Sequence, residues 1–171
     1  NKVYPGTFGG AVFTALILGD KKSISFRASN KLLTKIPNTG EYWHVLGQYI
    51  ITADYGQVII VNSATLRPLP SSALVGRLLT RHPAFRGFFL GKKKVSKLIS
   101  EIGEFSLVQL LNNNNYIAIG DCIAEVIAKQ LCIRWNKLKE ETEVATFFAE
   151  HGFDGILAAK IYKLCKFNTV L

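Results

Sequence analysis

The sequence predicts an α+β protein in which a small β-barrel precedes an array of short helices. Two patterns carry this prediction. Short runs rich in β-branched and aromatic residues alternate with turn signals up to about residue 62, and from residue 72 the apolar residues recur with a helical period. Of the 171 residues, 49% are hydrophobic and 19% are charged, which favours a packed core over a disordered chain.

Four strand signals occupy the first part of the chain. Polar and apolar side chains alternate strictly in residues 23–27, as in a strand with one solvated face, and residues 50–61 are typical of a hairpin closed around residues 53–56. Four or five strands in about 65 residues suit a small barrel, of which the OB-fold is one common type. We therefore expect an OB-like barrel domain over residues 1–68. The predicted strands are Val12–Leu18, Ile24–Ala28, Trp43–Thr52 and Gln57–Asn62.

A proline-containing segment, residues 67–72, interrupts the strand pattern. Pro68 and Pro70 are incompatible with a central strand, whereas Ser71 or Ser72 can cap a following helix. We place the domain junction here and expect a helical domain over residues 71–171.

Helical periodicity then continues to the end of the chain. Glycine-containing connectors at residues 87–91, 120 and 152–155 join short helices, a pattern typical of tandem helix–hairpin–helix units. The predicted helices are 72–81, 92–102, Phe105–Leu111, a segment marked by Ile119 to Leu131, Val144–Ala149, and a last one after Gly155.

Charge is distributed unevenly in this chain, whose formal net charge is +9. No Asp or Glu occurs between Tyr55 and Ser100, a stretch that holds eight Arg and Lys side chains. A basic surface attracts polyanions, although a merely solvated basic surface is the alternative at the level of charge alone.

The densest part of this basic stretch lies where a turn is predicted to enter a helix. A tight turn before a helix presents free backbone N–H groups, and lysines in the first helical turn add formal charge, so the pattern predicts a phosphate site. Those lysines oppose the helix dipole at a cost of a few tenths of a kcal/mol each, which a bound anion would relieve. The alternative is a tight connection with a solvated lysine cap. The expected DNA-binding residues are Arg86, Gly87, Gly91, Lys92, Lys93, Lys94 and Lys97.

The other two glycine junctions are weaker candidates. Asp121 and Asp154 stand where a phosphate would bind, so we expect these junctions to serve packing. Several aromatic residues are candidates for stacking on bases, although Trp43 more often fills a core. These aromatic residues are Tyr42, Trp43, Phe88 and Phe89.

No enzymatic constellation is evident. The run from Gly87 to Lys92 falls one residue short of a Walker A loop, and Lys93 stands where Ser or Thr would bind magnesium. No Ser, His and acid group suggests a nucleophile, and the three histidines lack metal-ligand spacing. We expect neither metal nor cofactor in this chain.

Cysteines and hydropathy indicate the compartment. The three cysteines show no C-x-x-C spacing, and their odd number favours a reducing cytosol and a cytoplasmic protein. They are Cys122, Cys132 and Cys165, all with apolar neighbours, so we expect them to be buried small hydrophobes. No apolar run approaches the roughly 18 residues that span a membrane, so no membrane partner is expected.

Taken together, a small barrel, a proline junction and tandem helix–hairpin–helix units resemble the N-terminal region of RecD-like superfamily 1 DNA helicases (exodeoxyribonuclease V alpha-subunit-like proteins). The resemblance is carried by residues 91–103, 123–135 and 147–162. In that family the first hairpin is similar to a Gly-hydrophobic-Gly turn followed by alanine, whereas here only Gly91 is kept and Val95 stands near the alanine's place.

The resemblance implies a role for the chain. It implies a non-catalytic region that holds single-stranded or duplex-junction DNA by its backbone in DNA repair and recombination, attached to C-terminal helicase motor domains of the same polypeptide. ATP and Mg are implied for that motor, which would lie beyond Leu171 and move 5′ to 3′. Two alternatives stay open, namely a protein-interaction module that docks a recombination or replication partner, and an RNA-binding module.

Overall fold

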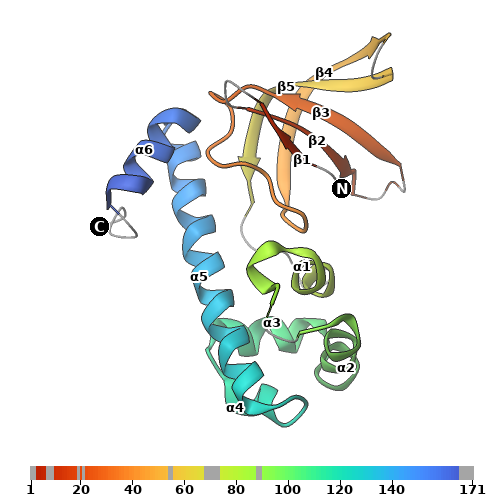
Figure 1. Cartoon of the computed structure of the whole chain (residues 1–171), viewed down its shortest axis with the longest axis vertical. Coiled ribbons are helices and arrows are strands. Elements are labelled where there is room, and N and C mark those ends of the chain that lie inside the picture. The colour runs from red at the N-terminus through yellow and green to blue at the C-terminus, as the bar shows by residue number, and fades with distance from the viewer. Residues whose placement is uncertain are drawn as a thin grey trace. The chain divides into compact units, whose positions relative to one another are not determined.

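A computed structural model describes residues 3–6, 10–18, 20, 22–53, 56–67, 74–87 and 90–165 of the chain. The protein is α+β, which confirms the predicted class (Figure 1). It folds into two compact units whose ranges interleave, one comprising residues 1–38, 43–67 and 143–171 and the other residues 39–42 and 68–142. The sequence predicts a single domain boundary between residues 68 and 71, whereas each of the two units contains residues from both sides of it. We call them the sheet unit and the helical unit.

The sheet unit contains one five-stranded sheet in the order β1-β2-β3-β5-β4. All neighbours pair antiparallel except β3 and β5, which are parallel. Among the described residues no pairing joins β1 to β4, so the sheet is open and its closure into an OB-like barrel is not confirmed. The strands are β1 Val3–Pro5, β2 Ala11–Leu16, β3 Ser23–Ala28, β4 Trp43–Thr52 and β5 Gly56–Leu66.

Three strands were predicted close to their observed bounds, because runs of β-branched and aromatic residues stand between turn signals. β4 has the predicted bounds, and β2 and β3 lie within two residues of theirs. β5 continues to Leu66, four residues beyond the prediction, because a register shift between Leu46 and Gly47 lets Ala64 and Leu66 return to the core after the polar pair at residues 62–63. β1 was missed, since three residues carry no readable period.

The core of the sheet unit lies on one face of the sheet. The rings of Phe13 on β2 and Phe26 on β3 stack with centroids 5.4 Å apart, and Ala11, Ala28 and Val61 are buried beside them. These residues alternate along their strands with exposed ones, which is the period-2 pattern of a half-buried sheet.

A glycine allows a close backbone approach in the sheet unit. The last helix, α6, spans Gly155–Cys165 and begins against the turn that follows β3, where the Gly155 N–H donates to the Lys31 carbonyl at 3.4 Å. A Cβ at Gly155 would overlap the backbone carbonyls of Asn30 and Leu33. Only glycine fits here, since the obstructing atoms are backbone and cannot rotate away.

Gly155→Ala is therefore expected to destabilise the sheet unit by about 1–3 kcal/mol, the range for inserting a methyl group into a packed site. Urea unfolding followed by circular dichroism measures the loss. Gly120→Ala is the matched control, because its Cβ would meet Glu125 no closer than 3.6 Å. Equal stability of the two variants would contradict the close approach.

The helical unit contains α1 to α4 and the first part of α5. α2 has the predicted bounds, and α1 and α3 agree with their predictions to within a few residues. No helix among the described residues is both long enough and apolar enough to cross a lipid bilayer. The bounds are α1 Val75–Arg81, the short 3-10 turn η2 Pro83–Phe85, α2 Lys92–Ile102, α3 Glu104–Asn112, α4 Tyr116–Gly120 and α5 Glu125–Glu150.

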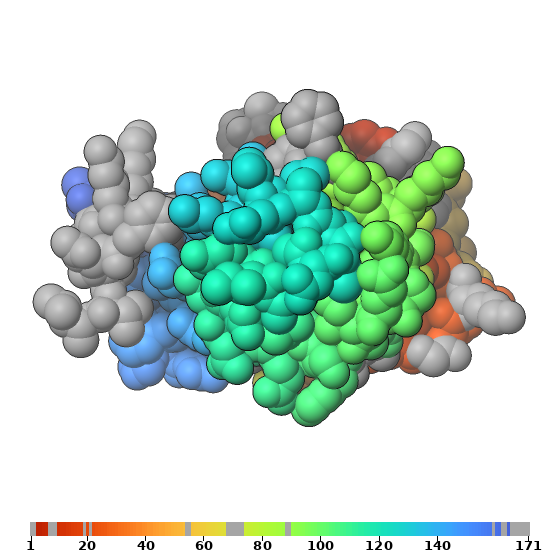
Figure 2. All heavy atoms as spheres, turned by 90° about the horizontal axis from the view of Figure 1, so that it is seen from below, coloured from red at the N-terminus to blue at the C-terminus, as the bar shows by residue number. Residues whose placement is uncertain are grey.

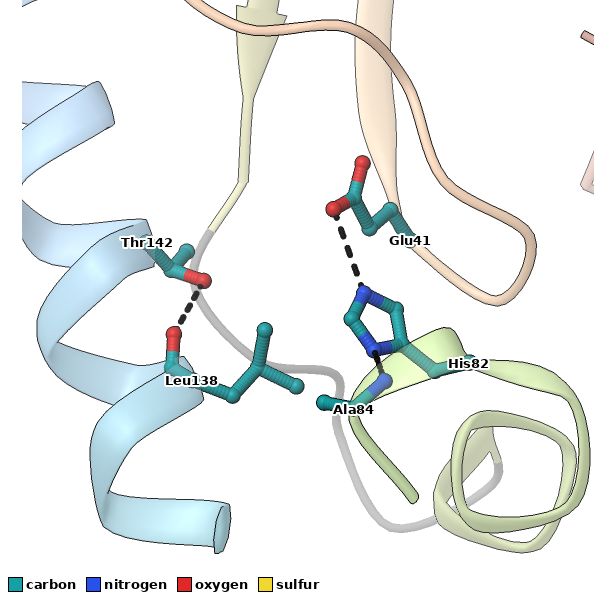
Figure 3. Close-up of polar contacts among 5 residues, drawn as sticks. All are labelled: Glu41, His82, Ala84, Leu138 and Thr142. Carbon is teal, nitrogen blue, oxygen red and sulfur yellow. Dashed lines mark hydrogen bonds and ion pairs between the residues drawn. The ribbon is translucent and has the colours of Figure 1, made fainter. Parts of the chain in front are cut away.

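The prediction of separate fourth and fifth helices was wrong. The fourth is interrupted between Gly120 and Glu125, and the helix that follows runs without a break through the polar residues 134–143. Leu138 and Thr142 keep the buried stripe of α5 continuous there, and the Thr142 hydroxyl donates to the Leu138 carbonyl at 2.8 Å (Figure 3). In the sequence, a buried threonine whose hydroxyl bonds to a carbonyl of its own helix cannot be told from an exposed polar residue that interrupts the apolar pattern.

Trp135 on α5 is at the centre of the helical unit's core. Its side chain is fully buried, and its indole N–H donates to Asn112 Oδ1 at 2.9 Å. Its ring lies 6.5 Å from that of Phe85 in η2. Buried residues from α1 to α5 surround it, namely Val75, Leu78, Leu79, Val95, Leu98, Leu107, Leu111, Ile119 and Leu131. The packing of Phe85 against Trp135 therefore connects the start of the turn before α2 with α5.

Candidate functional site

The chain between α1 and α2 forms an exposed turn that is anchored at both ends. Phe85 and Leu90 are buried in the core of the helical unit, whereas Arg86 and Gly87 between them are exposed. Gly87 has φ +81°, a left-handed conformation that favours glycine. Phe88 and Phe89 lie outside the described residues, so their predicted stacking on bases stays a prediction.

Gly91 caps the N-terminus of α2 without contributing a side chain. Its carbonyl accepts the N–H groups of Lys94 and Val95 at 3.0 and 3.1 Å. Within the described part of the chain no side-chain hydrogen bond caps this helix, and no acid lies in its first turn, while Lys92 and Lys93 are exposed. Because the first N–H groups of any helix have no acceptor within the helix, this end presents donors and positive charge together.

Two other helix starts differ from this one because an Asx side chain already caps them. Asp154 Oδ1 accepts the Leu157 N–H at 2.7 Å at the start of α6, and Asn115 Oδ1 accepts the Ala118 N–H at 3.2 Å at the start of α4. At the second glycine junction the first turn of α5 contains Glu125. That the junctions with Asp121 and Asp154 serve packing stays a prediction.

The Lys97 side chain is held by other groups of the chain. Its Nζ donates to the Cys122 carbonyl at 2.9 Å and lies 3.7 Å from Glu101 Oε1. These contacts hold the ammonium against the chain. The predicted contact of Lys97 with phosphate stays a prediction that requires the side chain to share or leave these partners.

Two side chains that the sequence analysis did not single out hold the start of the turn. The Arg134 guanidinium on α5 donates through Nη1 to the carbonyls of Ala84 at 2.8 Å and Arg86 at 2.9 Å. The His82 ring accepts the Ala84 N–H on Nδ1 at 3.1 Å. No sequence signal indicated Arg134, because it lies 48 residues beyond Arg86 in the chain.

The two helices that the turn connects, α1 and α2, pack closely against each other. A Cβ on Gly76 would come within 2.6 Å of Ile99 Cδ1, so glycine at this position allows the two helices to approach.

The described thiols offer no nucleophile near the turn. The pKa of the Cys122 thiol is raised, first by its hydrogen bond to Glu101 and then by burial, and burial raises the pKa of Cys132. Cys132 is fully buried, as expected of a small hydrophobe, while Cys122 is half-buried. A raised pKa keeps both thiols protonated at neutral pH.

Two of the aromatic residues that are candidates for stacking on bases, Trp43 and Tyr42, belong to different units. Trp43 belongs to the sheet unit, where it packs against the core, and Tyr42 belongs to the helical unit. On the face of the helical unit that Figure 2 shows, the residues coloured green to cyan form one continuous packed surface.

Comparison with protein-family models, with curated proteins and with solved structures gave no match.

Proposed function

We propose that this chain binds nucleic acid by its phosphate backbone, and that the turn between α1 and α2 makes the contact. The observation that carries the proposal is the start of α2, where an N-terminus without a side-chain cap or an acid coincides with Lys92, Lys93 and Lys94. Backbone N–H groups and a helix dipole bind phosphate without reading bases, so the binding has no sequence specificity.

Within this proposal, α1, the turn and α2 act as a helix–hairpin–helix element. The support is that Phe85 and Leu90 are buried at the two ends of the turn, that Arg86 and Gly87 are exposed, and that Gly87 has a left-handed conformation. Ends held in the core reduce the conformational freedom that the chain loses on binding, which favours affinity.

The sheet unit is assigned as an OB-like barrel in the same proposal. An OB-fold is a five-stranded, partly open barrel. What supports the assignment is the strand order β1-β2-β3-β5-β4 with its one parallel pair, β3 and β5. Closure would need β1 to pair with β4.

We further propose that the parent protein is an ATP-dependent, RecD-like DNA helicase of the cytoplasm that acts in DNA repair and recombination. This chain would hold the strand or junction, and the C-terminal motor domains would supply the work with ATP and Mg. The assignment is supported by the resemblance of residues 91–103, 123–135 and 147–162.

A pair of charge-matched variants tests the phosphate site. Lys92→Ala/Lys93→Ala removes two exposed lysines from the first turn of α2, and Lys129→Ala/Lys137→Ala removes two exposed lysines from α5. We expect the first pair to weaken binding similarly for all DNA sequences, and to lower the slope of log K against log salt by roughly 0.7–0.9 for each phosphate that the protein no longer neutralises. Fluorescence anisotropy with labelled oligonucleotides over a salt series measures both quantities.

Equal binding by the two double variants would refute the phosphate site. Single-stranded DNA, duplex DNA and RNA are titrated in parallel, and preference for RNA would favour the RNA-binding alternative. Absence of nucleic-acid binding at low salt, together with salt-insensitive binding to a replication or recombination protein, would favour the protein-interaction module.

A further inference from the structure

A buried acid–histidine pair lies directly before the phosphate-binding turn. The Glu41 side chain is 5% exposed and that of His82 is 4% exposed, and His82 Nε2 lies 3.3 Å from Glu41 Oε1 (Figure 3). Both residues belong to the helical unit, although 41 positions separate them in the chain. Burying a carboxylate is costly, so a buried one needs a role that an apolar residue would not fill.

The hydrogen bonds of the pair determine which ring nitrogen carries the proton. His82 Nδ1 accepts the Ala84 N–H at 3.1 Å, so it must present a lone pair. In the neutral ring the proton is then on Nε2, where it is donated to the Glu41 carboxylate. An imidazolium would carry a proton on Nδ1 as well and would lose the bond to Ala84.

Ala84 is held on both of its backbone polar groups by side chains. His82 accepts its N–H, and Arg134 donates to its carbonyl and to that of Arg86. The next residue, Gly87, is exposed. The position of the backbone at Ala84, just before it, therefore depends on the His82 ring keeping its orientation.

We propose that Glu41 is a positioning residue for the phosphate-binding turn: by accepting the Nε2 proton of His82, it holds the ring in the orientation in which Nδ1 accepts the Ala84 N–H. The proposal rests on the proposed function. It adds that the segment at residues 39–42, which contains no basic residue, contributes to nucleic-acid affinity without touching the nucleic acid.

Glu41→Ala and Glu41→Gln in the full chain test this role. Glu41→Ala removes the acceptor, and DNA affinity is expected to fall by about three- to ten-fold, the effect of losing one hydrogen bond. Glu41→Gln keeps an oxygen that accepts the Nε2 proton, and affinity is expected to stay within two-fold of the unsubstituted chain, about the spread of a near-neutral change. Nitrogen chemical shifts of the His82 ring report its hydrogen bonds. The Nε2 signal is expected to shift in the alanine variant, which lacks the acceptor, and to stay near its original position in the glutamine variant.

A third variant separates positioning from general loss of stability. Ile119→Val removes one methylene from the same core on α4, where Ile119 is fully buried, and leaves the residues of the turn untouched. This variant is expected to destabilise the helical unit slightly, as Glu41→Ala does, and to leave DNA affinity unchanged. All variants are compared well below their melting temperatures.

The outcomes are distinguishable. The proposal is overturned if Glu41→Ala binds DNA as tightly as the unsubstituted chain, if Glu41→Gln loses as much affinity as Glu41→Ala, or if Ile119→Val loses as much as either. It also falls if Lys92→Ala/Lys93→Ala binds no more weakly than its control pair on α5, a result that refutes the phosphate site itself. A loss of affinity in Glu41→Ala alone, with the Nε2 signal of His82 shifted, supports it.

Discussion

Gly91→Asp is expected to abolish most DNA binding while leaving α2 intact or slightly more stable. An aspartate at the N-cap accepts the N–H groups that would otherwise face the phosphate, as Asp154 does at the start of α6. The substitution fits, because Gly91 has φ −79° and a Cβ there meets nothing within 4 Å. It also places a negative charge where the phosphate would bind.

The expected magnitudes separate the two effects. Helix stability rises by a few tenths of a kcal/mol, since Asp only modestly exceeds Gly as an N-cap. DNA affinity falls by at least about ten-fold, because a charged hydrogen bond worth about 1.5–3 kcal/mol is removed and repulsion is added. Thermal denaturation and fluorescence anisotropy of the same samples measure both.

Gly91→Ala provides the control for Gly91→Asp. Alanine adds the same Cβ without a capping group or a charge, so most of the DNA affinity is expected to remain. If Gly91→Asp binds DNA as well as Gly91→Ala does, the start of α2 is not the site. If Gly91→Asp unfolds, the described geometry of the cap is wrong.

The largest loss of stability is expected for Trp135→Ala. The indole is fully buried, and its removal leaves a cavity next to Phe85 as well as an unpaired Asn112. Substitutions of this size cost about 3–5 kcal/mol. Urea denaturation followed by far-ultraviolet circular dichroism measures the loss.

Trp135→Phe separates packing from the hydrogen bond. A phenyl ring fills most of the cavity, so its cost is expected to be less than half of that of alanine. Because Phe85 packs on this ring and begins the turn, the alanine variant should also bind DNA more weakly. A loss of stability below about 1 kcal/mol in Trp135→Ala, the level of an average substitution, would contradict the central position of this residue.

Local sequence signals were sufficient to predict α2 and β4 with their correct bounds. α2 was predicted with its correct bounds because Gly91 precedes a clear apolar period at Val95, Leu98 and Ile102. β4 was predicted correctly for a similar reason, since its β-branched and aromatic residues stand between two turn signals. In both cases the deciding residues are neighbours in the chain.

Contacts between distant residues were not predictable in this way. Arg134 holds the Arg86 carbonyl across 48 positions, and Glu41 reaches His82 across 41. Each is a single polar residue in an ordinary setting, with no periodic pattern to mark it. The continuity of α5 was missed because it depends on burial of Leu138 and Thr142 by other helices.

The most direct measurement for the proposed site is a titration of the backbone amides of the full chain with a short single-stranded oligonucleotide, followed by nuclear magnetic resonance. We expect the largest shift changes at the N–H groups of Arg86, Gly87 and residues 91–94, saturating together and reversed by salt. Changes confined to the sheet unit or to α5, with the amides of residues 91–94 unmoved at saturation, would contradict phosphate binding at the start of α2.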